Sequence, residues 1–312
     1  MKYFCVPKCL IYNLNIEGIV MNQEETKNKI YKLSEEYDNG NCSVELENEL
    51  RELLEPFKKG SIGLAQINPI VGDIEYNSQK VVKYIKHAQN IGLDVVVFPE
   101  LTLMGYPIED TIDRHPVIVE ENVKWLKEIA KITKETAAIV GFVEPRKYDH
   151  LTGKKYYNSV AILQNGKIQG IIRKSLLPTY SEFNDYRYIE PSPVVGNQPS
   201  DTLGHFDEDM VQYCAKTNLI NSQKYGISIC EDCWNNKEFF NDTTLYSIDP
   251  IDELAQENPD VFINCSASPT RAKKEQLKHN MLSFVAEKYS TPIVYVNQVG
   301  AIDNSSCDGS SR

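Results

Sequence analysis

Short apolar runs alternate with amphipathic segments along most of this chain. Runs of β-branched and aromatic residues predict strands at residues 62–67, 94–98, 137–143, 158–164, 167–172, 225–229, 260–264 and 292–296. Apolar residues at spacings of three and four predict helices at residues 75–91, 117–135 and 271–289. Strands that alternate with helices in this way predict an α/β layered domain.

Residues 1–59 differ from this alternating part. The segments 24–37 and 44–57 have the charged, amphipathic pattern of helices, and residues 38–41 between them indicate a turn. We therefore expect a helical N-terminal extension at residues 1–59, followed by one domain at residues 60–312. The length of 312 residues would also allow two domains, but α/β domains of this size often form one core.

Composition excludes several classes of protein. A net charge of −11 argues against binding to nucleic acid, which rewards clustered Lys and Arg. No apolar run is long enough to span a membrane, and Pro7, Lys8 and Asn13 interrupt any secretory apolar core. The eight cysteines are scattered and do not form a disulfide framework. We therefore expect a cytoplasmic protein with reduced thiols.

Three of the predicted strands are followed closely by residues that can carry chemistry, namely Glu100, Lys174 and Cys230. Strand ends are where α/β folds gather their functional groups. A carboxylate that moves protons, an ammonium that stabilises negative charge and a thiol that attacks are sufficient for acyl transfer at an amide. Each residue also has an ordinary interpretation, because a cysteine after an apolar strand is usually buried packing and charged residues are usually solvated. The conjunction of three strand ends favours the functional interpretation.

The segments around these residues are distinctive. They read Phe-Pro-Glu-Leu at 98–101, Arg-Lys-Ser-Leu-Leu-Pro at 173–178 and Cys-Glu-Asp at 230–232. They resemble the motifs of the nitrilase superfamily of carbon-nitrogen hydrolases, whose members use Glu, Lys and Cys in this order. Further segments resemble the glutaminase domain of glutamine-dependent NAD synthetase, and they lie at residues 66–73, 105–107, 109–110, 180–188, 264–269 and 295–300.

The resemblance implies both a fold and a mechanism. The fold would be the four-layer α-β-β-α sandwich of the nitrilase type, here with its C-terminal strands truncated. Cys230 would attack the amide carbonyl, Glu100 would act as general base and acid, and Lys174 would stabilise the oxyanion. The product of this step would be a thioester that water then hydrolyses.

Five further residues are implied as substrate-binding. Tyr106 and Tyr180 each follow a member of the triad by six residues and would line the pocket, although buried tyrosine is often plain packing. Glu231 would bind the substrate ammonium or orient the lysine of the triad. Ser266 and Arg271 lie after a predicted strand, and Arg271 would suit the substrate α-carboxylate. The alternative for Arg271 is a solvated position at the start of a Lys-rich helix.

The resemblance also implies ligands and partners. L-glutamine would be the substrate, and an NAD synthetase domain or chain would accept the ammonia. The amide step would need no cofactor and no metal, because ATP and Mg²⁺ would belong to the synthetase domain, whose Ser-Gly-Gly phosphate loop this sequence lacks. Cys230 and Cys233 form a Cys-x-x-Cys, but the five histidines show no paired ligand spacing, so Cys233 is expected to be packing. We also expect a homo-oligomer.

Three functional hypotheses remain open from the sequence. The first is a glutaminase that supplies ammonia to NAD synthesis, and the segment at 180–188 favours it. The second is a free-standing amidase that acts on another small amide or carbamoyl compound. The third is a catalytically idle domain with an assembly or regulatory role, against which the intact set of Glu, Lys and Cys argues.

Overall fold

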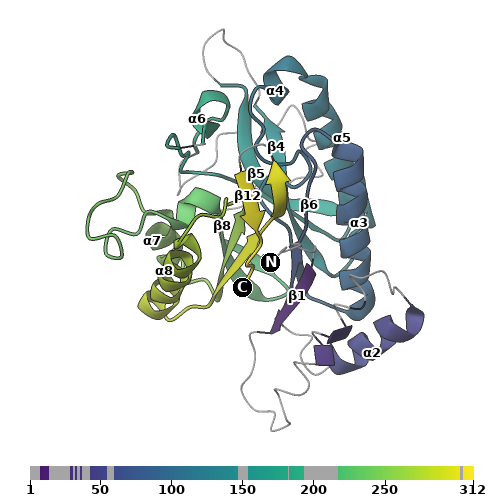
Figure 1. Cartoon of the computed structure of the whole chain (residues 1–312). Helices are drawn as coiled ribbons and strands as arrows, with labels where there is room; N and C mark the ends of the chain where they lie inside the picture. Colours follow the sequence, from purple (N-terminus) through teal and green to yellow (C-terminus); the bar gives the residue numbers. More distant parts are fainter. Residues whose placement is uncertain are drawn as a thin grey trace.

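The structure is a computed structural model, drawn in Figure 1. It has the α/β composition that the sequence predicts, and all eight predicted strands and three predicted helices of residues 60–312 are confirmed. No helix in the described part of the chain is long and apolar enough to cross a membrane. The residues that the structure describes are 8–13, 29–30, 32–33, 36, 43–54, 60–146, 154–181, 183–192, 217–302 and 305–312.

The first sheet has six strands in the order β1-β2-β3-β4-β5-β6. Strands β2, β3 and β4 run parallel, whereas β1, β5 and β6 run antiparallel to their neighbours. The strands are β1 (Lys8–Asn13), β2 (Ser61–Gln66), β3 (Val95–Val97), β4 (Ala137–Pro145), β5 (Tyr156–Gln164) and β6 (Lys167–Arg173).

The second sheet has the order β10-β9-β8-β7, in which β8, β9 and β10 run parallel. Its strands are β7 (Thr217–Ile220), β8 (Gln223–Ile229), β9 (Val261–Ser266) and β10 (Ile293–Asn297). A hairpin of β11 (Val299–Ile302) and β12 (Ser305–Asp308) follows. After it, Arg312 exchanges two backbone hydrogen bonds with Tyr295, at 2.7 and 2.9 Å, so the last residues lie along β10.

The long helices α3, α5 and α8 lie on the outer faces of the two sheets. The long helix α3 begins after Asp73, whose side chain accepts the Tyr76 N–H at 3.1 Å, and ends at Gly92 in a left-handed conformation. The helices are α2 (Val44–Leu54), α3 (Ile74–Ile91), α4 (Thr111–Arg114), α5 (Val117–Ile132), α6 (Asp185–Tyr188), the 3₁₀ helix η3 (Cys230–Cys233), α7 (Pro250–Ala255) and α8 (Lys274–Tyr289).

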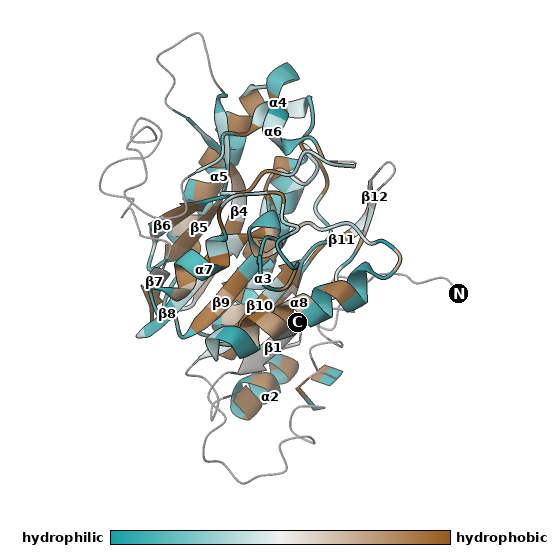
Figure 2. Ribbon diagram, turned by 90° about the vertical axis from the view of Figure 1, so that its left-hand side faces the viewer, coloured by the Kyte–Doolittle hydropathy of each residue, from teal (hydrophilic) through white to brown (hydrophobic). Residues whose placement is uncertain are grey.

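The core explains why the strands read as continuous apolar runs. One cluster between the two sheets joins residues such as Ile62 and Val97 of the first sheet to Ile227 and Ile263 of the second. On their other faces, the first sheet packs against α3 and α5 and the second against α7 and α8 (Figure 1). Strands covered on both faces favour apolar residues at every position, and Figure 2 shows the resulting hydrophobic strands.

The sequence predicted a helical N-terminal extension, but this extension also contains a strand. Its strand β1 pairs with β2 at the edge of the first sheet, from Lys8 opposite Gln66 to Asn13 opposite Ser61. The predicted helix at 44–57 is present as α2, which buries three leucines against the α3 side of the core. The described residues of the other predicted helix, 29, 30, 32, 33 and 36, are helical, and the turn at 38–41 lies outside the described residues.

Candidate active site

Glu100 and Lys174 meet in the interior, although 74 residues separate them in the sequence. Glu100 follows β3 after two residues, and Lys174 directly follows β6. The Lys174 Nζ donates a hydrogen bond to Glu100 Oε1 at 2.7 Å, and the two side chains are only 1% and 0% exposed. Strands β3 and β6 run in the same direction, with β4 and β5 between them, so their carboxyl ends lie at one edge of the sheet and bring this predicted pair together.

Two further donors fix the Glu100 carboxylate. The Asn158 Nδ2 donates to the same oxygen as Lys174, at 2.7 Å. The backbone N–H of Ala267 donates to the other oxygen, Oε2, at 3.1 Å. The carboxylate is thus held in one orientation by groups from β5, β6 and the segment after β9.

Lys174 is shared between two carboxylates. Besides Glu100, its Nζ donates to Asp185 Oδ2 at 2.8 Å, and the Tyr106 hydroxyl donates to Asp185 Oδ1 at 2.8 Å. Burial alone would lower the pKa of Lys174, but Asp185 and Glu100 outweigh it and the pKa lies well above its usual value. The ammonium is therefore charged at neutral pH, and Tyr106 contacts it indirectly through Asp185.

Cys230 directly follows β8 and has a left-handed backbone conformation, with φ of 43°. Such a conformation costs a residue with a side chain about 1–3 kcal/mol and needs surrounding contacts to hold it. Asp232 supplies them: its Oδ2 accepts the Ile229 N–H at 3.1 Å, and its Oδ1 accepts the N–H groups of Ser175 and Leu176 at 3.0 and 2.8 Å. Asp232 thus fastens the turn that carries Cys230 to the segment that follows Lys174.

The Cys230 thiol is buried, with 5% of its residue surface exposed. Burial and the nearby Glu100 raise its pKa well above the usual value, and Lys174 only partly opposes them. The resting sulfur is therefore a neutral thiol. It needs a base to ionise when a substrate arrives, and Glu100 is the carboxylate whose charge it senses most strongly.

A cavity of about 490 Å³ opens beside Cys230. It combines aromatic walls with charged groups of both signs. Its lining residues are Tyr180, Phe183, Cys230, Glu231, Trp234, Ser268, Arg271, Ala272, Lys273, Lys274 and Leu277.

Glu231 is the carboxylate of this cavity. The Tyr180 hydroxyl donates to both of its oxygens at 3.0 Å, and the Tyr246 hydroxyl donates to Oε1 at 3.2 Å. Burial raises the pKa of Glu231, and Lys174 and the two tyrosine hydrogen bonds partly oppose that rise. Two hydroxyls therefore orient one buried carboxylate beside the thiol.

The other predicted substrate-binding residues occupy different places. Arg271 lines the cavity but is exposed, and its guanidinium donates to Ser181 Oγ. Ser266 is buried, and its hydroxyl donates to Asn264 Oδ1 at 2.6 Å. Ser266 is absent from the cavity lining, whereas Ser268, two residues further along, is part of it.

Four residues at the site were not singled out by the sequence. Asp185 lies within the segment at 180–188, so the resemblance pointed to its neighbourhood without giving its role. Lys274 lies just beyond Arg271 in the same Lys-rich stretch. Asn158 stands inside a predicted strand and Tyr246 in a long loop, and nothing in the local sequence connects either to Glu100 or Glu231.

The second cysteine of the Cys-x-x-Cys motif, Cys233, is a packing residue. The Cys233 Sγ donates to the Cys230 carbonyl at 3.2 Å and packs in the cluster under α8, beside Phe262 and Met281. Within the described ranges, no three His, Cys, Asp or Glu side chains are grouped as metal ligands. Cys233 is therefore part of the packing behind the turn.

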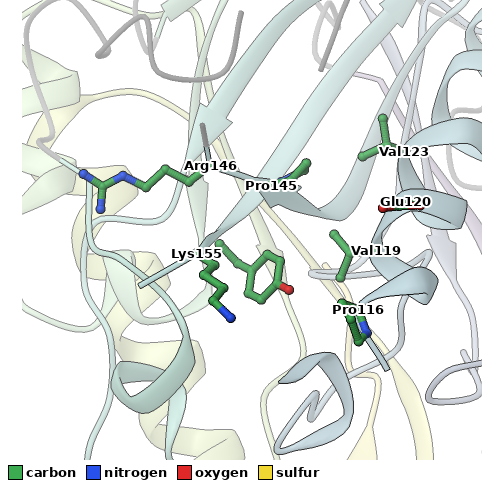
Figure 3. A pocket seen from close by; sticks show the side chains of 8 residues that line it. Pro116, Val119, Glu120, Val123, Pro145, Arg146 and Lys155 are labelled. Carbon is green, nitrogen blue, oxygen red and sulfur yellow. The ribbon is translucent and has the colours of Figure 1, made fainter. Parts of the chain in front are cut away.

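A second cavity, of about 330 Å³, lies between the start of α5 and the adjoining ends of β4 and β5 (Figure 3). Figure 3 shows Val119 and Glu120 of the helix on one side and Pro145, Arg146 and Lys155 on the other. None of the site residues predicted from the sequence lines it. The predicted nucleophile lies in the first cavity instead.

Comparison with known proteins identifies the family of this chain. The family description "Carbon-nitrogen hydrolase" matches residues 61–240, which is more than half of the chain. The chain belongs to the carbon-nitrogen hydrolase family. The chain is therefore an enzyme of the carbon-nitrogen hydrolase type.

The individual relatives include NAD synthetases and an amidase. The chain is 33% identical over 254 residues to the glutamine-dependent NAD(+) synthetase of Synechocystis sp., covering 80% of this chain and 41% of that protein. A solved glutamine-dependent NAD+ synthetase from Acinetobacter baumannii superposes with a TM-score of 0.62 at 29% identity, covering 80% of this chain and 40% of that one. An amidase from Nesterenkonia sp. AN1 shares the fold, with a TM-score of 0.59 at 14% identity, covering 80% and 83%. This carbon-nitrogen hydrolase therefore spans about two fifths of the length of the curated relatives that it matches.

Proposed function

We propose that this carbon-nitrogen hydrolase releases ammonia from the side-chain amide of L-glutamine, for use by an NAD synthetase domain or partner chain. The relatives with more than 30% identity carry glutamine-dependent NAD(+) synthetase as their name. The ammonia acceptor is part of the proposal, since the chain matches only about two fifths of their length.

One observation carries the choice of substrate: the cavity beside Cys230 holds charges of both signs. Glu231 is a carboxylate oriented by two tyrosine hydroxyls, and Arg271 and Lys274 are cations on the same cavity. A substrate with both an ammonium and a carboxylate, such as an α-amino acid, matches that pattern. A simple aliphatic amide would leave these charges without partners, which is costly in a partly buried site.

The first half of the reaction forms a thioester. Glu100 removes the Cys230 thiol proton as the sulfur attacks the amide carbon, and the carbonyl oxygen becomes an oxyanion. The charged Lys174 stabilises that oxyanion, with a backbone N–H near Cys230. When the intermediate collapses, the carbon–nitrogen bond breaks, and Glu100 delivers its proton to the departing nitrogen, so that ammonia leaves.

The second half restores the thiol. Glu100 removes a proton from water as the water attacks the thioester carbon, again through an oxyanion stabilised by Lys174. Collapse releases glutamate, and the proton returns to the Cys230 sulfur. No metal or organic cofactor takes part in these steps as we propose them, and ATP and Mg²⁺ belong to the synthetase reaction.

A covalent label tests the nucleophile and the pocket together. Incubation with 6-diazo-5-oxo-L-norleucine, an electrophilic analogue of glutamine, is expected to add one label at Cys230, detected by mass spectrometry of peptides. Cys230→Ala is expected to abolish ammonia release, whereas the matched variants Cys233→Ala and Cys265→Ala lose far less. A label on another cysteine, or full activity in Cys230→Ala, would overturn the assignment.

A substrate panel tests the choice of amide. Ammonia release from L-glutamine is compared with release from asparagine, nicotinamide and a carbamoyl compound at equal concentrations. Glutamine is expected to give the highest kcat/KM, because only glutamine presents both charges at the right distance from its amide. A carbamoyl or other amide substrate that exceeds glutamine by about tenfold or more would favour a free-standing amidase instead.

A further inference from the structure

The loop at residues 235–249 connects η3 to α7, and one of its side chains reaches back to the active site. Tyr246, near the end of this loop, is half-buried, and its hydroxyl donates to Glu231 Oε1 at 3.2 Å. Tyr246 is absent from the described lining of the cavity beside Cys230, whereas Glu231 is part of it. The tyrosine therefore contacts the carboxylate from outside the cavity and can act on a substrate only through it.

The backbone of Tyr246 is held by one buried side chain, that of Asn235. Only 1% of Asn235 is exposed, and its Nδ2 donates to the carbonyls of Tyr246 and Ile248 at 2.9 and 2.5 Å. Its Oδ1 accepts the Tyr246 N–H at 3.3 Å, so one amide binds both backbone groups of the tyrosine. Asn235 lies two residues after the end of η3. The position of Tyr246 is thus tied to the turn that carries the nucleophile.

The two tyrosine hydroxyls bind the oxygens of Glu231 differently. A hydroxyl carries one hydrogen, so Tyr180, whose oxygen lies 3.0 Å from both Oε1 and Oε2, shares that hydrogen between them. Tyr246 donates to Oε1 alone. Each carboxylate oxygen has two lone-pair sites. Among the residues that the structure describes, both sites of Oε1 are occupied and one site of Oε2 is open, and Tyr246 makes that difference.

We propose that Tyr246, presented by Asn235, is a positioning residue that leaves one oxygen of Glu231 available to the ammonium of the substrate. This inference rests on the proposed function, since it assumes an α-amino acid amide in the cavity. The ammonium would bind at Oε2, while the substrate amide would face Cys230. Tyr246 would then set the preference for substrates with an α-amino group without contacting them.

Removing one hydroxyl tests the proposal. Tyr246→Phe keeps the ring, and Tyr289→Phe is the matched control, because the Tyr289 hydroxyl donates to the Asp252 carboxylate outside the described lining of the cavity. Two substrates are compared, L-glutamine and glutaramate, which has the same amide and carboxylate but lacks the α-amino group. In Tyr246→Phe, kcat/KM for glutamine is expected to fall by about tenfold, mainly through KM, while kcat/KM for glutaramate stays nearly constant.

The pH profile separates an effect on the carboxylate from a general loss of packing. A hydrogen bond to the charged form lowers a carboxyl pKa, so Tyr246→Phe raises the pKa of Glu231. The acid limb of kcat/KM for glutamine is therefore expected to move to higher pH in Tyr246→Phe and to stay in place in Tyr289→Phe. The other titratable or charged groups that face Glu231 are unchanged, and they are Lys174, Tyr180, Lys274 and Cys230. An unshifted acid limb in a folded Tyr246→Phe protein would overturn the proposal.

The role of Asn235 is tested by a double-mutant cycle. Asn235→Leu is expected to lower kcat/KM for glutamine by a similar factor, and adding Tyr246→Phe is expected to cost little more, because both changes remove the same contact. If Asn235→Leu melts far below the wild type, Asn235→Asp replaces it, since the aspartate keeps the size of the side chain but lacks the two N–H donors. Fully independent losses would contradict the presentation of Tyr246 by Asn235.

The two substrates separate this proposal from the proposed function. If the wild type prefers glutamine to glutaramate and Tyr246→Phe keeps that preference, Tyr246 is not a positioning residue, although the proposed function stands. An equal loss on both substrates in a folded variant also contradicts the proposal, and it would indicate that Glu231 orients Lys174 instead. If the wild type does not prefer glutamine to glutaramate, the proposed function itself fails.

Discussion

Arg173 and Lys174 are neighbours in the sequence, and both are buried cations, yet their surroundings differ. Arg173 makes a bidentate contact with Glu144, through Nε at 2.9 Å and a terminal nitrogen at 2.7 Å, and its guanidinium lies 3.9 Å from the Tyr157 ring centre. Lys174 instead contacts Glu100 and Asp185 beside a buried thiol.

The difference follows from the alternation of side chains along a strand. Successive residues of β6 point to opposite faces of the sheet. Arg173 therefore lies on the same face as Ile171, which is covered by helices. Lys174 lies on the same face as Ile172, which is directed between the two sheets. A guanidinium suits a closed, planar pair with one carboxylate, whereas an ammonium can be shared among several groups. We expect the first cluster to act on stability and the second on catalysis.

The largest effect is expected from Lys174→Gln. This change removes the charge that stabilises the oxyanion, so kcat is expected to fall by about 10²–10³ or more, with a smaller effect on KM. Steady-state ammonia release measures both constants, and circular dichroism confirms that the variant is folded. Equal and modest changes in kcat and KM would instead indicate a positioning role and would contradict the contrast with Arg173.

Arg173→Met is expected to act on stability. The change leaves the Glu144 carboxylate buried without its cation, so the free energy of unfolding is expected to fall by about 3–5 kcal/mol, measured by urea denaturation. The double variant Arg173→Met, Glu144→Leu removes both charges and is expected to recover most of that loss. A folded Arg173→Met protein with a kcat as low as that of Lys174→Gln would remove the distinction between the two clusters.

His87 is a third buried basic group, and it differs from Arg173 and Lys174 because burial keeps it neutral. Burial, with a further contribution from Lys83, lowers the pKa of His87 on α3 from 6.5 to about 4. Between these two values the unfolded chain binds the proton and the folded chain does not. Protonation of His87 in the unfolded chain therefore leaves the free energy of unfolding nearly unchanged above pH 6.5. As the pH drops toward 4, it lowers that free energy, by about 2 kcal/mol at pH 5.

The variant His87→Leu isolates this contribution. Urea denaturation at pH 7 and at pH 5 gives the free energy of unfolding of each protein at both pH values. The decrease from pH 7 to pH 5 is expected to be about 2 kcal/mol larger for the wild type than for His87→Leu. The subtraction removes the effect of carboxylates, which both proteins share. If the two losses are equal, His87 is already protonated in the folded protein at pH 5, and Glu47, whose Oε1 lies 3.7 Å from its Nδ1, is then the partner that holds the charge.

The secondary structure of residues 60–312 was predictable because periodicity is a local property. Apolar runs and three-and-four spacing predicted every long strand and helix of that part. The strand β1 was missed for the opposite reason. Its six residues gain their structure from pairing with β2, 48 to 58 positions away, and nothing in the run itself indicates that partner.

The site also has a part that the sequence predicts and a part that only the tertiary structure shows. The sequence by itself determined which strand ends carry a carboxylate, an ammonium and a thiol, because each motif is contiguous. Only the tertiary structure decided that Asp185 and Asn158 complete the surroundings of Lys174 and Glu100, and that Ser266 points into the interior. It also decided that Lys274, rather than only Arg271, stands in the cavity. The contacts of Asp185 and Asn158 join residues 11 and 58 positions apart, and their geometry depends on strand order and packing, which no local pattern contains.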